Sequence, residues 1–275
     1  MDMGRVEKKL NLGCGERFLP SWVNCDFQSN SPNVLVHDLQ NPLPFPKESF
    51  QVAYHSHVLE HLKPANARKF LLECQRVLSP GGLLRTVIPD LEQRARIYLQ
   101  SLEEAIPSRD SGALSRHEWM ILELVDQHVR EKSGGEMVDF ILSGKEKEFV
   151  KQRLGDEYNH VLRHGKAERP KTAATHGWSV RSSIRNLLKA WAKKILKISD
   201  AELATLQFER LGERHRWMYD RLSIRKLLHE CGFEEIREVD AFSSQVAGWK
   251  EDGLWLDVEN GKPRKPDSLY IEARR

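Results

Sequence analysis

The sequence predicts an α/β protein with a mostly parallel seven-stranded sheet, an antiparallel edge strand and a helical insertion. In the first ninety residues, short apolar runs alternate with loops and one clear helical stretch, the pattern of βα units. From Leu91 to about Arg214 the apolar spacing becomes mostly helical. The chain then closes with two strand-like runs, 236–242 and 268–273, around a long loop. Such an ending suits an antiparallel pair at the edge of a parallel sheet.

The first expected strand, Lys9–Leu12, is stopped by a Gly13-Cys14-Gly15 turn. Three further runs each end at a polar residue, where an α/β sheet presents its ligand-facing edge. These runs are 22–26, 34–37 and 50–55. A helix is predicted from Ala65, because apolar residues recur at helical spacing until Ser79-Pro80-Gly81-Gly82 interrupts them before a strand over 83–88.

The middle of the chain is expected to be a helical insertion over residues 91–215. Helical spacing predicts helices over 91–104, 116–131, 146–154, 182–197 and 200–210. Residues 1–90 and 216–275 would then form one Rossmann-like sheet domain that binds the cofactor. Because open α/β sheets bind ligands at the carboxyl ends of their strands, an insertion after Asp90 is placed to form an acceptor pocket or a lid.

Composition excludes several classes of protein. With 275 residues, 40% of them hydrophobic, the chain is long enough to bury a core without disulfides. Its four cysteines form no C-x-x-C pair, which argues against a zinc ribbon or a thioredoxin-type redox motif. No apolar run is long enough to span a bilayer, and the first residues lack the apolar region of a signal peptide. We expect a cytoplasmic protein.

The net charge of +3 hides an uneven distribution. Residues 160–199 carry ten Lys and Arg against one acid, Glu168, and the helix expected over 182–197 is basic and amphipathic. Such a helix can contact an anionic membrane surface, although a solvated basic face is the more frequent explanation. No nucleic-acid-reading module accompanies the charge, so we expect no nucleic-acid partner. The oligomeric state is not predicted.

The G-x-G turn lets backbone amides approach a polar or anionic ligand. Asp26 follows at the end of the next strand, 13 positions after Gly13, where a carboxylate can accept both ribose hydroxyls of an adenosine ligand. A dinucleotide fingerprint has its acid about 20 residues on and a third glycine, which is absent here. This spacing disfavours NAD, and a nicotinamide-dependent oxidoreductase is kept as an alternative.

Six short motifs in order resemble class I S-adenosylmethionine-dependent methyltransferases and cover nearly all of residues 8–90. The branch with ubiquinone- and menaquinone-biosynthesis enzymes is the most similar, together with small-molecule and glycan-pathway methyltransferases. The motifs are Asn11-Leu12-Gly13-Cys14-Gly15, Asp26, His37-Asp38-Leu39, Leu43-Pro44-Phe45-Pro46, His57-Val58-Leu59-Glu60-His61-Leu62 and Arg76-Val77-Leu78-Ser79-Pro80-Gly81-Gly82. The resemblance implies S-adenosylmethionine as the cofactor and methyl transfer as the activity. One branch often occurs in bacterial polysaccharide gene sets, which says nothing physical about the acceptor. We expect the acceptor to be a small hydroxylated molecule, such as a sugar or glycan precursor, rather than nucleic acid.

The resemblance also implies a set of cofactor-binding residues. Gly13 and Gly15 would approach the methionine moiety and Asp26 the ribose hydroxyls, while Asp38 with Leu39 would border the adenine. The remaining expected cofactor-binding residues are Asn11, Cys14, Phe27 and His55, the last of these near the methionine end.

Two positions depart from the family pattern. An acid is usual where Asn11 stands, and an Asp is usual where Gln51 follows Phe50. Asn11 can still accept a hydrogen bond from the ligand amine, but the charge attraction is lost. These departures favour an alternative, a methyltransferase-like binding protein without catalysis.

For an oxygen acceptor, methyl transfer needs in-line geometry and benefits from a general base. His57 and His61 are the expected catalytic residues, because imidazole is largely neutral at neutral pH. The competing interpretation is that His61 orients a helix start and His57 packs on the cofactor.

The H-x-x-E-H spacing of His57, Glu60 and His61 also matches certain zinc proteases. We expect neither a protease nor a metal ligand set, because no distant third ligand can be named from the sequence. A divalent cation that orients a hydroxylated acceptor stays open as an alternative.

Overall fold

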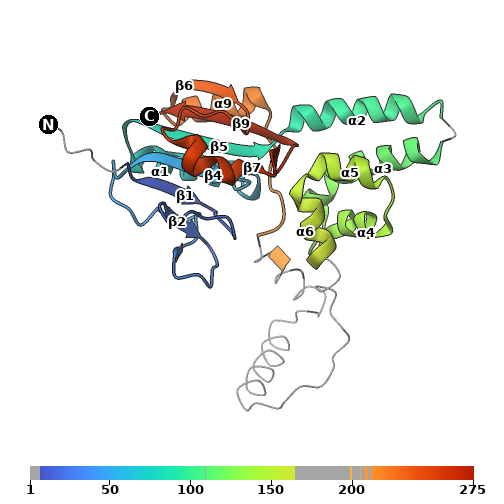
Figure 1. The fold of residues 1–275 in the computed structure, drawn as a ribbon, viewed down its shortest axis with the longest axis horizontal. Coiled ribbons are helices and arrows are strands. Elements are labelled where there is room, and N and C mark those ends of the chain that lie inside the picture. Colours follow the sequence, from blue (N-terminus) through green and yellow to red (C-terminus); the bar gives the residue numbers. More distant parts are fainter. Residues whose placement is uncertain (1–6, 109, 165–198, 200–204, 206–207, 210–211) are drawn as a thin grey trace, which may run out of the picture.

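The computed structural model describes residues 7–108, 110–164, 199, 205, 208–209 and 212–275. A seven-stranded sheet forms its centre, in the order β3-β2-β1-β4-β5-β9-β6 (Figure 1). The strands are β1 Lys9–Leu12, β2 Val23–Asp26, β3 Val34–Val36, β4 Phe50–Ser56, β5 Leu78–Pro89, β6 Glu234–Val239 and β9 Ser268–Arg274. The predicted mostly parallel α/β sheet is therefore confirmed.

The antiparallel strand lies one place further inside the sheet than the sequence predicts. Strand β9 runs antiparallel to both β5 and β6, so β6 is the edge strand and is parallel to the others. The register of β9 places Glu272 beside Arg85 and Ile271 beside Thr86. The ion pair between Arg85 and Glu272 favours this register. The spacing of apolar residues in the sequence gives no indication of such a pair.

Helices cover one face of the sheet. Helix α1, Pro64–Val77, and helix α9, Arg221–Glu230, contribute Phe70, Leu71, Ile224 and Leu228 to a core with the strand residues Leu10 and Leu84. Asp220 and Ser223 form a capping box at the start of α9. The Ser79–Gly82 run, expected to be a turn, is instead the first part of β5.

The opposite face of the sheet is covered by the chain between β6 and β9. This segment contains the π-helical turn η2, Trp249–Gly253, the helix α10, Leu254–Asp257, and a small antiparallel pair of β7, Val258–Glu259, with β8, Lys262–Pro263. Trp22, Tyr54 and Trp249 are at the centre of its apolar contact with the sheet.

Helices α2–α6 lie beside the sheet, at the right in Figure 1. They are α2 Leu91–Ala105, α3 Ser111–Val129, α4 Gly135–Ser143, α5 Lys147–Leu154 and α6 Asp156–His164. The fully buried Trp119 packs on Phe140 in a separate apolar core, which also contains Met120 and Tyr158. Helices α4 and α6 were not predicted from the sequence. The helix expected over 182–197 lies outside the described residues, and most of 200–210 does too.

None of the helices in the described part of the chain is long and apolar enough to cross a bilayer.

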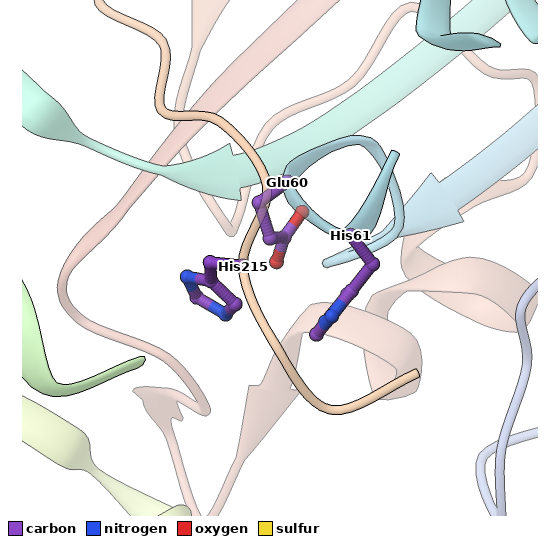
Figure 2. Close-up of side chains that lie close together, drawn as sticks. All are labelled: Glu60, His61 and His215. Atoms are coloured by element: carbon purple, nitrogen blue, oxygen red, sulfur yellow. The ribbon is translucent and has the colours of Figure 1, made fainter. Parts of the chain in front are cut away.

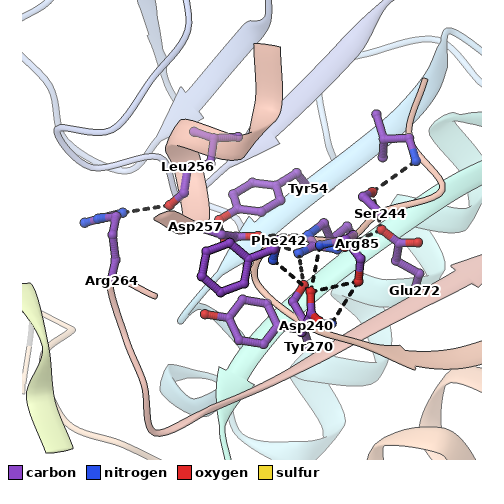
Figure 3. Close-up of polar contacts among 12 residues, drawn as sticks. Tyr54, Arg85, Asp240, Phe242, Ser244, Leu256, Asp257, Arg264, Tyr270 and Glu272 are labelled. Atoms are coloured by element: carbon purple, nitrogen blue, oxygen red, sulfur yellow. Dashed lines mark hydrogen bonds and ion pairs between the residues drawn. The ribbon is translucent and has the colours of Figure 1, made fainter. Parts of the chain in front are cut away.

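A buried arginine ties the covering segment to the sheet. Arg85 on β5 is fully buried, and its guanidinium lies 2.8 Å from carboxylate oxygens of both Asp257 and Glu272 (Figure 3). The same group donates hydrogen bonds to the carbonyls of Asp240 and Ser243, at 2.8 and 2.9 Å. A buried cation is tolerated only when its hydrogen bonds are made, and here two carboxylates and two carbonyls accept from it.

The same network positions a side chain at the ligand edge of the sheet. The Tyr54 hydroxyl on β4 donates a 2.6 Å hydrogen bond to Asp257 Oδ1, and the Arg85 guanidinium lies 4.4 Å from the ring centroid of Trp249. Burial and the neighbouring carboxylate raise the pKa of Tyr54 well above its ordinary value.

We predict that Arg85→Met destabilises the protein by about 3–5 kcal/mol, because Asp257 and Glu272 would stay buried without a cation. Urea unfolding followed by circular dichroism measures this change. The control is Arg96→Met, which removes an exposed pair with Glu92 and should cost about 0.5 kcal/mol or less. Equal effects of the two changes would contradict a structural role for the Arg85 network.

Candidate functional site

A cavity of about 770 Å³ opens at the carboxyl ends of β1 and β4, between the sheet and helices α3, α4 and α6. Its sheet side is lined by the residues after these two strands, and its other side by polar residues of the helices and of the loop before β9. On the sheet side the lining residues are Asn11, Gly13, Cys14, Gly15, Tyr54, Ser56, His57 and His61.

The glycine turn after β1 requires residues without a side chain. Gly13 has a φ of +67°, and a Cβ at this position would lie 2.3 Å from Val58 Cγ2. Its amide donates to the carbonyl of Cys25 at 2.8 Å, which fixes the turn to β2. Gly15 also has a positive φ, of +52°, but open space around it. The turn therefore exposes backbone to the cavity, as the G-x-G pattern predicts.

Asp26 stabilises this turn. The carboxylate is 7% exposed and accepts hydrogen bonds from the amides of Gly15, at 2.8 Å, and Gln28, at 3.2 Å. Asn11 is almost fully buried, and its amide nitrogen donates to the carbonyl of Arg17 and to Asn24 Oδ1. Its side-chain nitrogen is thus occupied, so the carbonyl oxygen is the atom available for a ligand.

Five of the predicted cofactor residues do not line the cavity: Asp26, Phe27, Asp38, Leu39 and His55. Asp26 lies behind the cavity wall, where it accepts a hydrogen bond from the amide of Gly15, a lining residue. Asp38 is exposed and accepts from the amide of Gln40, while Leu39 packs in the core under the glycine turn. Phe27 is 53% exposed.

His55 is a core residue. Because side chains alternate along a strand, Tyr54 and Ser56 face the cavity and His55 points to the opposite face of the sheet. There its ring packs against Phe70, with Nε2 3.1 Å from Thr86 Oγ1. Burial lowers the pKa of His55 to about 3. The His55 side chain therefore does not line the cavity, because strand ends alone do not tell which face a residue takes. Its expected place near the methionine end stays a prediction.

His57 follows directly after β4 and lines the cavity. It has a φ of +54°, which is uncommon for a residue with a side chain, and its amide donates to the carbonyl of Val87 at 2.8 Å. Its Nε2 lies 2.8 Å from Ser268 Oγ, and its Nδ1 lies 3.1 Å from Glu60 Oε1. Burial lowers the pKa of His57, so the imidazole is neutral at neutral pH.

His61 meets a histidine from a distant part of the chain. The short helix η1, Leu59–His61, carries Glu60 and His61, and the ring of His215 lies 4.8 Å from that of His61 (Figure 2). One potential ligand atom from each of these three residues lies within 4.8 Å of the others. The sequence did not identify His215 as a site residue, because it lies outside any helix or strand and its distance along the chain from His61 gives no spacing signal.

Other cavity residues were also missed. Arg94, His160, Arg264 and Lys265 line the cavity, and no periodic pattern marks them. Gln127 and Arg130 were not missed: as polar residues around the Gly134-Gly135 turn, they are predicted from the sequence to contact acceptor hydroxyls. Both line the cavity, at the end of α3.

Gln51, one of the two departures from the family pattern, lies at the start of β4, at the other end of the strand from the cavity. Its side chain accepts from the amide of Lys8 and donates to Ser79 Oγ. It is therefore not near the cofactor edge, and this departure does not argue against cofactor binding.

Residues 18–86 match the model of a family described as a methyltransferase domain. The match supports a methyltransferase domain in this part of the chain. It covers β2–β4, η1, α1 and most of β5, and so includes Asp26, His57 and His61. The search of curated proteins gave no match.

Several solved structures are similar to this chain. S-adenosylmethionine-dependent methyltransferases from Thermotoga maritima and Methanosarcina mazei are 13% and 14% identical, with TM-scores of 0.38 and 0.39. The alignments cover 99% of this chain in both cases, and 84% and 94% of those chains. One from Archaeoglobus fulgidus is 10% identical, with a TM-score of 0.39 over 98% of this chain and 86% of that chain. At these values the similarity says nothing about the substrate.

We predict that acid destabilises the protein partly through His55. Its pKa is near 6.5 in the unfolded chain and about 3 in the folded one, so between these values the unfolded state binds the extra proton and stability falls as the pH falls. The slope for one proton is about 1.4 kcal/mol per pH unit. Urea unfolding at pH 6 and pH 4.5 should show a shallower dependence for His55→Gln, which keeps a partner for Thr86. An unchanged slope would contradict a neutral buried His55.

Proposed function

We propose that this chain is an S-adenosylmethionine-dependent methyltransferase that acts on an oxygen atom of a small hydroxylated acceptor, with a sugar or glycan precursor as the favoured class. The observation that carries the proposal is the single cavity that joins the glycine turn to the polar residues of the helices. Its volume, about 770 Å³, lies in the range of small-molecule sites.

The cofactor would occupy the sheet side of the cavity. The glycine turn, without side chains, would leave room for the methionine end, and the carbonyl oxygen of Asn11 would accept a hydrogen bond from the ligand amine. Asp26 uses one lone pair of each oxygen for a backbone amide, and a carboxylate has about four acceptor sites. Two sites are therefore left for ribose hydroxyls.

The acceptor would occupy the helical side. Gln127, Arg130, His160 and Lys265 place donors and acceptors around this part of the cavity. These polar groups stand among apolar side chains such as Met137 and Ile141, a mixture that suits a small ligand with several hydroxyl groups on a carbon frame. A cytoplasmic location, a role in polysaccharide biosynthesis and contact of residues 182–197 with a membrane stay predictions from the sequence.

Methyl transfer needs the acceptor oxygen in line with the sulfonium methyl group. As the oxygen bonds to the methyl carbon, the electron pair of the broken C–S bond stays on sulfur and gives S-adenosylhomocysteine. The acceptor proton passes to His57, whose ring is held by Glu60 on Nδ1. His61 is the second candidate base, because it also lines the cavity.

A binding protein without catalysis is the second candidate function. Asn11 favours it, because an amide attracts the ligand amine less strongly than a carboxylate does. Detection of one methylated product excludes this alternative.

We predict that Asp26→Asn weakens S-adenosylhomocysteine binding about 10- to 100-fold, the value expected for hydrogen bonds to a charged group. Asn keeps an acceptor for the Gly15 amide, so the turn should hold. Calorimetric titration measures the affinity, and Asp139→Asn, an exposed acid on α4, is the control. Preferential binding of NAD by the wild type would overturn the proposal in favour of an oxidoreductase.

We predict that the wild-type protein transfers labelled methyl groups from S-adenosylmethionine to small hydroxylated molecules in fractionated cell extract. His57→Gln should lower this turnover about 10²- to 10⁴-fold without changing cofactor affinity, because it removes the base and leaves the glycine turn intact. His229→Gln, on the exposed side of α9, is the control.

Two results would contradict these assignments. Label that appears chiefly in RNA, DNA or protein would refute the acceptor class. Near-normal turnover of both His57→Gln and His61→Gln would show that positioning alone drives the transfer.

A further inference from the structure

We propose that Glu60, His61 and His215 form a binding site for a divalent transition-metal ion at the inner end of the cavity, and that this ion takes the acceptor hydroxyl oxygen as a further ligand. The role in acceptor binding rests on the proposed function, whereas the metal site itself does not. The three side chains point toward one another (Figure 2).

The donor set is the first argument. Two imidazoles and one carboxylate are the ligands of catalytic zinc sites and of related sites with open positions. Bonds of about 2.0–2.2 Å place two donor atoms about 3.4 Å apart in a tetrahedral site. The potential ligand atoms here lie within 4.8 Å of one another. Side-chain rotations that move each atom by about 1 Å would bring them to the spacing of a metal site.

Unmet hydrogen bonding is the second argument. Glu60 is fully buried; its Oε2 has no hydrogen-bond partner, and its Oε1 faces only His57 Nδ1, at 3.1 Å. Nδ1 of His61 and Nδ1 of His215 are buried without a partner as well. Buried polar atoms are almost always satisfied in folded proteins, and this cluster contains three that are not. A cation would satisfy several of them at once.

The cluster is held from two sides before any ligand binds. The amides of Arg216 and Trp217 donate to the carbonyl of Glu60, at 2.6 and 3.2 Å. The amide of His215 donates to the carbonyl of Gln127 at 2.9 Å. Backbone contacts therefore fix His215 against η1 and α3, which makes a preformed site.

Nearby charges are mostly balanced. Arg94 pairs with Asp267 and lies 3.5 Å from Glu123, and Arg130 lies 3.7 Å from Glu213. Lys265 is the remaining cation that interacts with Glu60. It lines the same cavity, where it is placed to contact the acceptor.

The open coordination position of the ion would face the cavity, because His61 and His215 line the cavity. A hydroxyl oxygen bound there becomes more acidic, since the cation stabilises the alkoxide. Its proton would pass to His57, whose ring lies next to Glu60, with Nδ1 3.1 Å from Oε1. The oxygen then forms its bond to the methyl carbon as the C–S bond breaks, with the electron pair left on sulfur.

The test uses the whole chain, treated with a chelator and then titrated with Co²⁺ alone, without cofactor or acceptor. We expect one equivalent to bind and to produce the visible absorption bands of a cobalt ion with nitrogen and oxygen ligands. Competition with Zn²⁺ should abolish the bands. Absence of binding by the folded wild type, judged by circular dichroism, would overturn the proposal.

The variants Glu60→Gln and His215→Gln should each bind Co²⁺ at least about 100-fold more weakly, because changing even an outer partner of a metal ligand costs about 10- to 100-fold. His229→Gln should bind like the wild type. Equal affinities of all four proteins would place the ion elsewhere and refute the assignment. Because these measurements need no methyl transfer, a failure of the proposed function leaves them unchanged and is recognised separately.

Discussion

The pairing of Arg85 with Asp257 and Glu272 is the interaction on which the rest of the structure depends. It joins β5, β9 and the segment that covers one face of the sheet, and it does so in a region from which water is excluded. Through Asp257 the same network holds the Tyr54 hydroxyl, and Tyr54 forms part of the cavity wall. Because a buried cation is costly without all its partners, the network also demands one arrangement of these segments.

The cavity is assembled from three separate parts of the chain. The strand ends supply the glycine turn and His57, the helical segment supplies Gln127 and Arg130, and the loop before β9 supplies Lys265. A separate apolar core around Trp119 holds helices α2–α6 together. The strand ends therefore form one wall of the cavity, and the separately packed helices form the opposite wall.

Buried histidines have different roles on the two sides of the same strand. His55 faces the core, where burial lowers its pKa and Thr86 is its partner. Two residues on, the positive φ of His57 turns its ring toward Glu60 and Ser268 in the cavity wall. A difference in backbone conformation at one residue thus separates a structural histidine from a candidate base.

The sequence by itself determined the sheet, the glycine turn and the first helix, because apolar periodicity and glycine chemistry act over a few residues. Glycine chemistry pointed to Gly13 and Gly15 as a ligand turn, and the family resemblance added Asn11 and Cys14; all four line the cavity. Only the tertiary structure decided that β9 lies inside the sheet, that His55 faces the core, and that His215 meets Glu60 and His61. Each of these depends on contacts between residues far apart in the chain, here more than 150 residues for His215 and Glu60. Such contacts follow from packing and charge pairing in three dimensions, which no local pattern encodes.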